Sequence, residues 1–92
     1  MKVVWDPAKA KANLLKHGIR FSDAEGVLSD PMALTREDDA SEGEQRLVSL
    51  GMNHLTRIVV VSFTMRGELI RLISARRASK KERKQYAQRI RF

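Results

Sequence analysis

Four cationic side chains crowd one short junction near the C-terminus: Arg76, Arg77, Lys80 and Lys81. The junction joins an apolar, strand-like run to a charged, helix-like run. Ser79 and Glu82 have the spacing of a capping box, which predicts that the helix begins at Lys80. Cationic side chains would then meet unpaired backbone N–H groups and the positive end of a helix dipole. This combination suits the binding of a phosphate group.

The charge of the chain is divided unevenly. Residues 66–92 hold ten Lys or Arg against two acids, whereas residues 1–65 hold eight against nine, so the net charge of +7 belongs to the last third. A one-sided field of this kind predicts a polyanionic partner. A solvated charged face is the alternative interpretation of such a run.

Length and composition limit the classes of protein that the chain can form. A chain of 92 residues without cysteine predicts a single domain over residues 1–92, with no disulfide, thiolate metal site or thiol nucleophile. Its longest nearly unbroken apolar run, residues 58–63, is far below the ~20 residues that a membrane helix needs. The N-terminus carries no signal-peptide pattern. We therefore expect a cytoplasmic protein.

Local signals predict the elements that must position the cationic residues. Asp6 and Pro7 favour the start of a helix and Gly18 favours its end. Ser22 and Glu25 repeat the capping-box spacing and predict a second helix. The expected elements are strands over residues 2–5, 32–35, 45–50, 56–64 and 68–75, with helices over 7–17, 23–28 and 80–90.

This order, β-α-α-β-β-β-β-α, predicts an α+β domain with helices on one face of a mostly antiparallel sheet. The opposite face would then be free. Alternation along the last strand places Arg71 and Arg76 on opposite faces, and it does not say which face is exposed. Residues 36–44 form an acidic loop that could fold against the basic junction.

The motifs, taken in order, resemble those of the BrnT family of bacterial toxins, and the resemblance covers nearly the whole chain. The matching residues are Trp5-Asp6, Lys9, Asn13, Lys16-His17-Gly18, Phe21, Ala24, Asp30-Pro31, residues 41–46, Arg66-Gly67, residues 70–76, Glu82-Arg83 and Tyr86. The resemblance implies a RelE-like fold and a type II toxin that cleaves RNA and so inhibits translation and growth. The resemblance also implies that the toxin forms a complex with a BrnA-like ribbon-helix-helix antitoxin. This complex would bind operator DNA only through the antitoxin.

A ribonuclease of this kind must activate the ribose 2′-OH, protonate the leaving oxygen and neutralise the phosphorane. His17 is the acid–base candidate because an unperturbed imidazole has a pKa of ~6.5. The full catalytic set that we expect is His17, Arg66, Arg71, Arg76 and Tyr86. The RNA-binding set is Arg76, Arg77, Lys80, Lys81 and Arg83. We expect no metal, no other cofactor, and a 2′,3′-cyclic phosphate product.

Each of these assignments has a structural alternative. His17 could cap the last carbonyls of its helix, and Tyr86 could pack in the core. Arg76 and Arg77 could pair with the acidic loop or with Glu82 rather than with phosphate. Glu44 or Glu42 could serve as a general base, although a solvated acidic linker is the simpler interpretation. For the whole chain, the alternatives are a non-catalytic nucleic-acid-binding module and, less well supported, a domain that binds an acidic protein.

Overall fold

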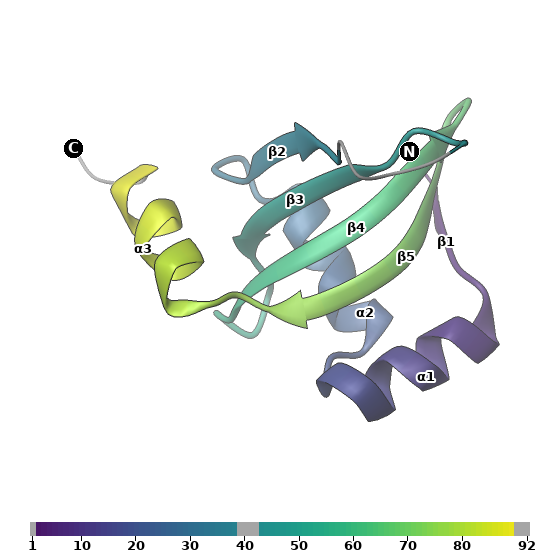
Figure 1. Cartoon of the computed structure of the whole chain (residues 1–92), viewed down its shortest axis with the longest axis horizontal. Helices are drawn as coiled ribbons and strands as arrows, with labels where there is room; N and C mark the ends of the chain where they lie inside the picture. The colour runs from purple at the N-terminus through teal and green to yellow at the C-terminus, as the bar shows by residue number, and fades with distance from the viewer. Residues whose placement is uncertain (1, 39–42, 90–92) are drawn as a thin grey trace.

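The computed structural model describes residues 2–38 and 43–89 (Figure 1). The elements in order are β1 (Lys2–Val4), α1 (Pro7–His17), α2 (Phe21–Ala24), the 3-10 helix η1 (Glu25–Ser29), β2 (Leu34–Glu37), β3 (Leu47–Met52), β4 (Ile58–Arg66), β5 (Leu69–Arg77) and α3 (Lys80–Arg89). The predicted α+β class and element order are confirmed. Residues 39–42 of the acidic loop and the predicted helix end at residue 90 lie outside the described residues. No described helix is long and apolar enough to cross a membrane.

One five-stranded sheet forms the centre of the domain, in the order β1-β5-β4-β3-β2. Strands β2 to β5 make an antiparallel meander, and β1 adds to β5 in parallel, so the sheet is mixed. The first strand of the chain therefore pairs with the last, and β5 lies between β1 and β4. Each predicted strand of the meander lies within two residues of its observed position, an uncertainty that is usual for element ends.

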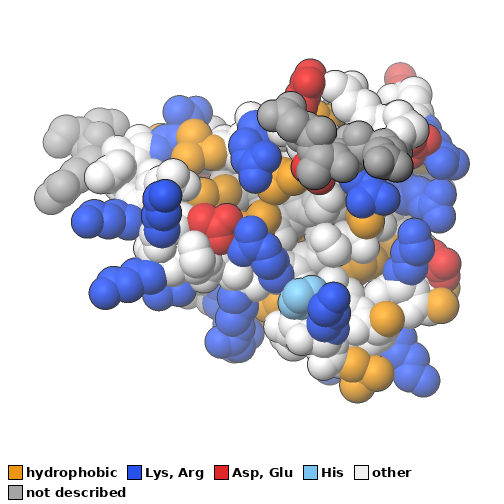
Figure 2. Space-filling view, in the orientation of Figure 1, with side chains coloured by type: hydrophobic (Ala, Val, Ile, Leu, Met, Phe, Trp, Pro, Cys, Tyr) orange, Lys and Arg blue, Asp and Glu red, His pale blue; other side chains and the backbone are white. Residues whose placement is uncertain are grey.

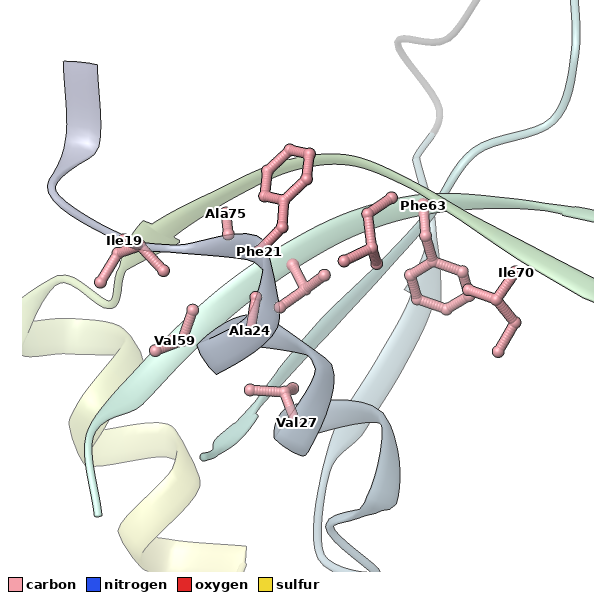
Figure 3. Packing of buried hydrophobic residues seen from close by; sticks show 10 residues of the cluster. Ile19, Phe21, Ala24, Val27, Val59, Phe63, Ile70 and Ala75 are labelled. Atoms are coloured by element: carbon pink, nitrogen blue, oxygen red, sulfur yellow. The ribbon is translucent and has the colours of Figure 1, made fainter. Parts of the chain in front are cut away.

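The helices divide between the two faces of the sheet. Side chains from the segment between α1 and η1 pack against one face in the main core: Ile19 after α1, Phe21 and Ala24 of α2, and Val27 of η1 (Figure 3). Tyr86 of α3 belongs to a second buried cluster with Leu50, Val60 and Ala78. Neighbours Val59 and Val61 join the main core, whereas Val60 joins the second cluster, as alternation along a strand requires. The prediction that all helices cover one face is therefore wrong, because α3 crosses to the other.

Two of the three predicted helix starts are confirmed at the level of hydrogen bonds. The Asp6 side chain accepts from the Ala8 backbone N–H at 2.9 Å, and Gly18 ends α1 in the left-handed region at φ 71°. In α3 the Ser79 N–H donates to Glu82 Oε1 at 2.8 Å, and the Glu82 N–H donates to Ser79 Oγ at 3.2 Å. Both caps use residues within three positions of each other, so the sequence spacing can indicate them.

The second helix begins earlier than its capping box predicts. It starts at Phe21 with Arg20 as N-cap and no side-chain cap bond, so the assignment of Ser22 as its cap is wrong. Phe21 is 2% exposed and lies in the main core, with its ring at 82° to that of Trp5. Burial of this large side chain outweighs the local capping preference and fixes where the helix begins.

An irregularity in β5 changes which side chains share a face. Leu72 pairs with Phe63, yet Ser74 pairs with Ser62, so Ile73 is one residue extra on β5. A bulge of this kind shifts the alternation by one position. Buried side chains on both sides of the bulge therefore face the main core: Ile70, Leu72 and Ala75. Arg71, Ser74 and Arg76 all lie on the opposite face, called the open face below, whereas strict alternation would have separated the two arginines.

Candidate functional site

Small polar side chains lie at the centre of the open face, and arginine side chains lie around them. One row of cross-strand partners runs Arg36, Val48, Ser62 and Ser74 from β2 to β5. The two serines in the middle of the face are small, so the longer side chains around them surround a depression. Figure 2 shows Lys and Arg side chains spread over this side of the molecule around a paler, mostly uncharged centre.

Four hollows follow one another across the open face from α3 to β1 and form a trough. We name them the α3 hollow (about 640 Å³), the Ser62 hollow (about 290 Å³), the Glu44 hollow (about 170 Å³) and the Trp5 hollow (about 410 Å³). Neighbouring hollows share an arginine: Arg36, then Arg46, then both Arg66 and Arg71. A trough with a cation at every junction matches the regular charge of a polynucleotide backbone.

The Glu44 hollow holds the densest group of charges. Its lining residues are Lys9, Glu44, Arg46, Thr64, Arg66, Arg71 and Ile73. Arg66 Nε donates to Glu44 Oε2 at 2.8 Å, and this hydrogen bond is the main reason why the pKa of Glu44 lies below its ordinary value. Glu44 is therefore a carboxylate at neutral pH, among four cationic side chains from α1, β4, β5 and the segment before β3.

At the junction between β5 and α3, where the sequence suggests a phosphate site, the free protein places one of its own carboxylates. Arg76 makes two hydrogen bonds to the Glu82 carboxylate, at 2.7 and 3.0 Å. The hydrogen bond from Arg76 is the main cause that lowers the pKa of Glu82 to about 2, and the same bond raises the pKa of Arg76. Glu82 also accepts from the Ser79 N–H, so the protein's own carboxylate occupies the positive end of α3.

The other predicted RNA-binding residues are spread over both faces. Arg77 pairs with Val59, a core-facing residue, so it lies on the face opposite to Arg76. Lys81 lines the α3 hollow, and Lys80 is exposed at the start of α3. Arg83 donates to the Ala78 carbonyl at 2.9 Å, which ties it to the turn before α3. The structure therefore brings only Arg76 and Lys81 of this set to the trough.

Asn13 attaches α1 to the edge of β5 beyond the end of β1. Its amide donates to the Ala75 carbonyl at 2.9 Å and to the Ile19 carbonyl at 3.0 Å, and it accepts from the Ala75 N–H at 3.0 Å. The side chain thus pairs an otherwise bare strand edge. Lys9 and His17 lie one turn before and one turn after Asn13 on the same helix stripe.

His17 is half-buried and stands at the far end of α1 from the Glu44 hollow. Helix α1 runs beside β5 in the same direction (Figure 1), so Lys9 lies near Arg71 and His17 lies toward the end of β5. His17 follows Lys9 by eight positions on α1, which corresponds to ~12 Å along the helix axis. The structure therefore does not bring His17 together with Arg66 and Arg71.

Tyr86 is packed in the second buried cluster, between α3 and the sheet. It is 5% exposed, and its hydroxyl donates to Asp30 Oδ2 at 2.6 Å. Burial, followed by this hydrogen bond, raises the pKa of Tyr86 to about 12. Burial also opposes ionisation of Asp30, but hydrogen bonds from the Met52 N–H, the Tyr86 hydroxyl and the Met32 N–H together lower the pKa of Asp30. These contacts favour the core-packing alternative for Tyr86, because its one polar side-chain atom is bonded inside a cluster that holds α3.

Three cationic residues of the trough are absent from the sets expected from the sequence, in which every cationic side chain comes from residues 66–92. Lys9, Arg36 and Arg46 come from the first half, where the net charge is slightly negative. Lys9 and Arg46 stand within the motifs quoted above, which was the one signal available. Within the described ranges, no three acidic or histidine side chains converge on one point where they could hold a metal ion.

A small α+β domain with an arginine-lined trough and a carboxylate among cations belongs to the class of proteins that act on nucleic acid. Residues 5–82 match the family described as "Ribonuclease toxin, BrnT, of type II toxin-antitoxin system". The 1.1 Å crystal structure of the Brucella abortus ribonuclease toxin BrnT is 35% identical, with a TM-score of 0.69, over 87% of this chain and 99% of that one. No curated protein matches the chain.

The chain therefore belongs to the BrnT family of ribonuclease toxins of type II toxin–antitoxin systems. The resemblance seen in the sequence motifs is confirmed, as is the fold that it implied. Membership implies endoribonuclease activity, an RNA substrate and an antitoxin partner.

Proposed function

We propose that this protein is a cytoplasmic, metal-independent endoribonuclease toxin whose cleavage centre is the Glu44 hollow. The observation that carries the proposal is the convergence of Glu44 with four cationic side chains, Lys9, Arg46, Arg66 and Arg71, around one hollow of about 170 Å³. A small site of this kind fits a single phosphate group. The larger hollows on either side leave room for the flanking nucleotides.

The charges of the hollow suit each step of a transesterification. Arg66 leaves Glu44 for the scissile phosphate, and the freed carboxylate accepts the proton of the 2′-OH as this oxygen attacks phosphorus. Arg66, Arg71 and Arg46 neutralise the charge that develops on the phosphorane. The bond to the 5′ oxygen breaks, and the ammonium of Lys9 supplies a proton to that oxygen. The products are a 2′,3′-cyclic phosphate and a 5′-hydroxyl end.

The test is cleavage of single-stranded RNA by purified protein in EDTA, followed by analysis of the product ends. Arg71→Ala should reduce the single-turnover rate ~10²–10³-fold, because it removes a preorganised cation. Glu44→Gln should reduce it ~10²–10⁴-fold, because it removes the proton acceptor. Arg57→Ala and Glu25→Gln are matched controls, since both residues are exposed and lie outside the trough.

Two outcomes would contradict this proposal. Activity that disappears in EDTA and returns only with Mg²⁺ would replace the cation mechanism with a metal-dependent one. Tight RNA binding without cleavage, unchanged by Glu44→Gln, would favour the non-catalytic binding module.

The proposed partner is a ribbon-helix-helix antitoxin that covers the trough. The basis is the family's type II antitoxin, together with an open face that is rich in arginine and that no described helix covers except at the α3 end. In this proposal the complex binds operator DNA only through the antitoxin, because the trough of the toxin is then occupied.

A further inference from the structure

The Trp5 hollow differs in character from its neighbours in the trough. Its lining residues are Val4, Trp5, Asp6, Pro7, Arg66, Leu69 and Arg71. Most of its wall is therefore apolar or aromatic, in a part of the surface that is otherwise strongly cationic. Leu69 remains 41% exposed there, which is unusual for a large apolar side chain at a concave position. An apolar hollow open to solvent indicates a ligand.

The fold builds this hollow from three adjacent segments. Val4 pairs with Arg71 and Arg66 pairs with Leu69, so β1, β5 and β4 supply its floor. Trp5 follows directly after β1 and is half-buried, with one edge against Phe21 at a ring-centroid distance of 6.1 Å. The indole is thus held in place by the main core while it still forms part of the wall.

Arg66 and Arg71 line both the Trp5 hollow and the Glu44 hollow. A ligand that filled both would carry an anionic group on one side of the two guanidinium groups and a flat, apolar group on the other. A nucleotide has this form. Proteins that recognise single-stranded RNA commonly stack its splayed bases on aromatic rings and arginine planes.

We propose that the Trp5 hollow is a base-binding subsite that takes one unstacked base of single-stranded RNA next to the phosphate held in the Glu44 hollow. The proposal rests on the proposed function, since it names the nucleotide that the same site would hold. A side chain of a protein partner is the competing occupant. RNA is favoured because the two arginines on the rim complement a phosphate at the position where the neighbouring hollow would bind it.

Trp5 is the only tryptophan of the chain, so its fluorescence reports on the hollow in the unmodified protein. The probe is a short oligoribonucleotide with a 2′-deoxy substitution at each attacking position, which prevents cleavage. A second series replaces one base at a time by an abasic site. At one position, and only there, we expect the abasic change to abolish the fluorescence change and to weaken binding roughly 5-fold or more.

Leu69→Ala shows whether this effect comes from the hollow. The variant should bind the intact oligonucleotide more weakly and lose most of the discrimination against the abasic one. Leu15→Ala is the matched control, because Leu15 is 80% exposed on α1 and lines none of the hollows of the trough.

The outcomes separate this inference from the proposed function. Intact oligonucleotides that bind without changing Trp5 fluorescence, or equal losses for Leu69→Ala and wild type at every abasic position, would overturn the base subsite while leaving cleavage possible. A fluorescence change produced by the antitoxin but not by RNA would assign the hollow to the protein partner and also overturn it. Absence of any RNA binding would overturn both proposals.

Discussion

Glu82 holds the guanidinium group of Arg76 in an ion pair. Its carboxylate receives two hydrogen bonds from the guanidinium and one from the Ser79 N–H, so a residue that belongs to a helix cap also restrains an arginine of the open face. The pair is an internal contact in the free protein. RNA would have to displace a well-placed carboxylate before it could use this guanidinium.

Glu82→Gln should destabilise the protein by up to about 1 kcal/mol at neutral pH, because it removes the partly exposed ion pair with Arg76 while its amide oxygen can still accept from the Ser79 N–H. Because the folded pKa of Glu82 is lowered to about 2, its contribution is present above the ordinary value of 4.5 and is lost as the pH falls toward 2. Urea denaturation of both proteins over this range should therefore give converging free energies of unfolding. A difference that stays constant with pH would show that the carboxylate charge is not its source.

The position of His17 argues against the acid–base role that the sequence suggests for it. Since it lies ~12 Å along α1 from Lys9, we expect His17→Ala to leave the single-turnover cleavage rate nearly unchanged. The loss of a basic residue in the last turn of α1 should lower stability by ~0.3–1 kcal/mol. Thermal melts and rate measurements on the folded protein test both parts. A rate loss on the order of 10²-fold, with the disappearance of an ionisation near neutral pH, would restore His17 as the acid or base.

At the scale of elements, α1 and the bulge in β5 together shape the trough. The bulge at Ile73 puts Arg71 and Arg76 on one face, and Asn13 holds α1 against the strand so that Lys9 reaches the Glu44 hollow. Neither feature is itself a reactive group. Both determine which charged groups meet.

Asn13→Ala should lower the free energy of unfolding by about 2–4 kcal/mol, because it leaves the Ala75 N–H and carbonyl without their partner in a buried place. The same change should weaken RNA cleavage in the folded protein by loosening Lys9. Lys11→Ala, at an exposed position on the same helix, is the control and should change neither quantity much. A stability loss below ~0.5 kcal/mol would mean that water replaces the amide at this edge.

At the scale of the whole molecule, our proposals place both RNA and the antitoxin on the open face. The four hollows share one continuous cationic trough, so two large ligands cannot occupy its centre together. The charge of the domain should also make RNA binding steeply dependent on salt.

We expect a stable complex with a ribbon-helix-helix antitoxin in which RNA cleavage falls in proportion to the antitoxin added. Arg71→Glu should weaken both RNA binding and this complex, because it reverses a charge at the centre of the trough, whereas Arg57→Glu should spare both. Size-exclusion chromatography and cleavage titrations measure the two effects, and a gel shift with operator DNA should appear only when antitoxin is present. A complex that forms at full strength with Arg71→Glu and still cuts RNA would place the antitoxin elsewhere.

The sequence by itself determined the features that depend on near neighbours. The Asp6–Gly18 helix, the Ser79–Glu82 cap and the antiparallel meander are each specified by residues a few positions apart, so local spacing was enough to predict them. The ordered motifs likewise identified the family.

The tertiary structure alone decided which charged side chains meet in the Glu44 hollow. The extra residue in β5 placed Arg71 and Arg76 on the same face of the sheet, whereas strict alternation predicts opposite faces. No local sequence signal marks this bulge, because its position depends on the pairing of β5 with β4. Glu82 turned the expected phosphate junction into an internal ion pair. The Glu44 hollow joins Lys9 to Arg71 and Arg46 to Arg66, groups far apart along the chain that meet only because α1 and three strands pack together. Long-range packing of this kind produces no periodic pattern in the sequence. The number of cationic residues could therefore be read from the sequence, but their positions relative to one another could not.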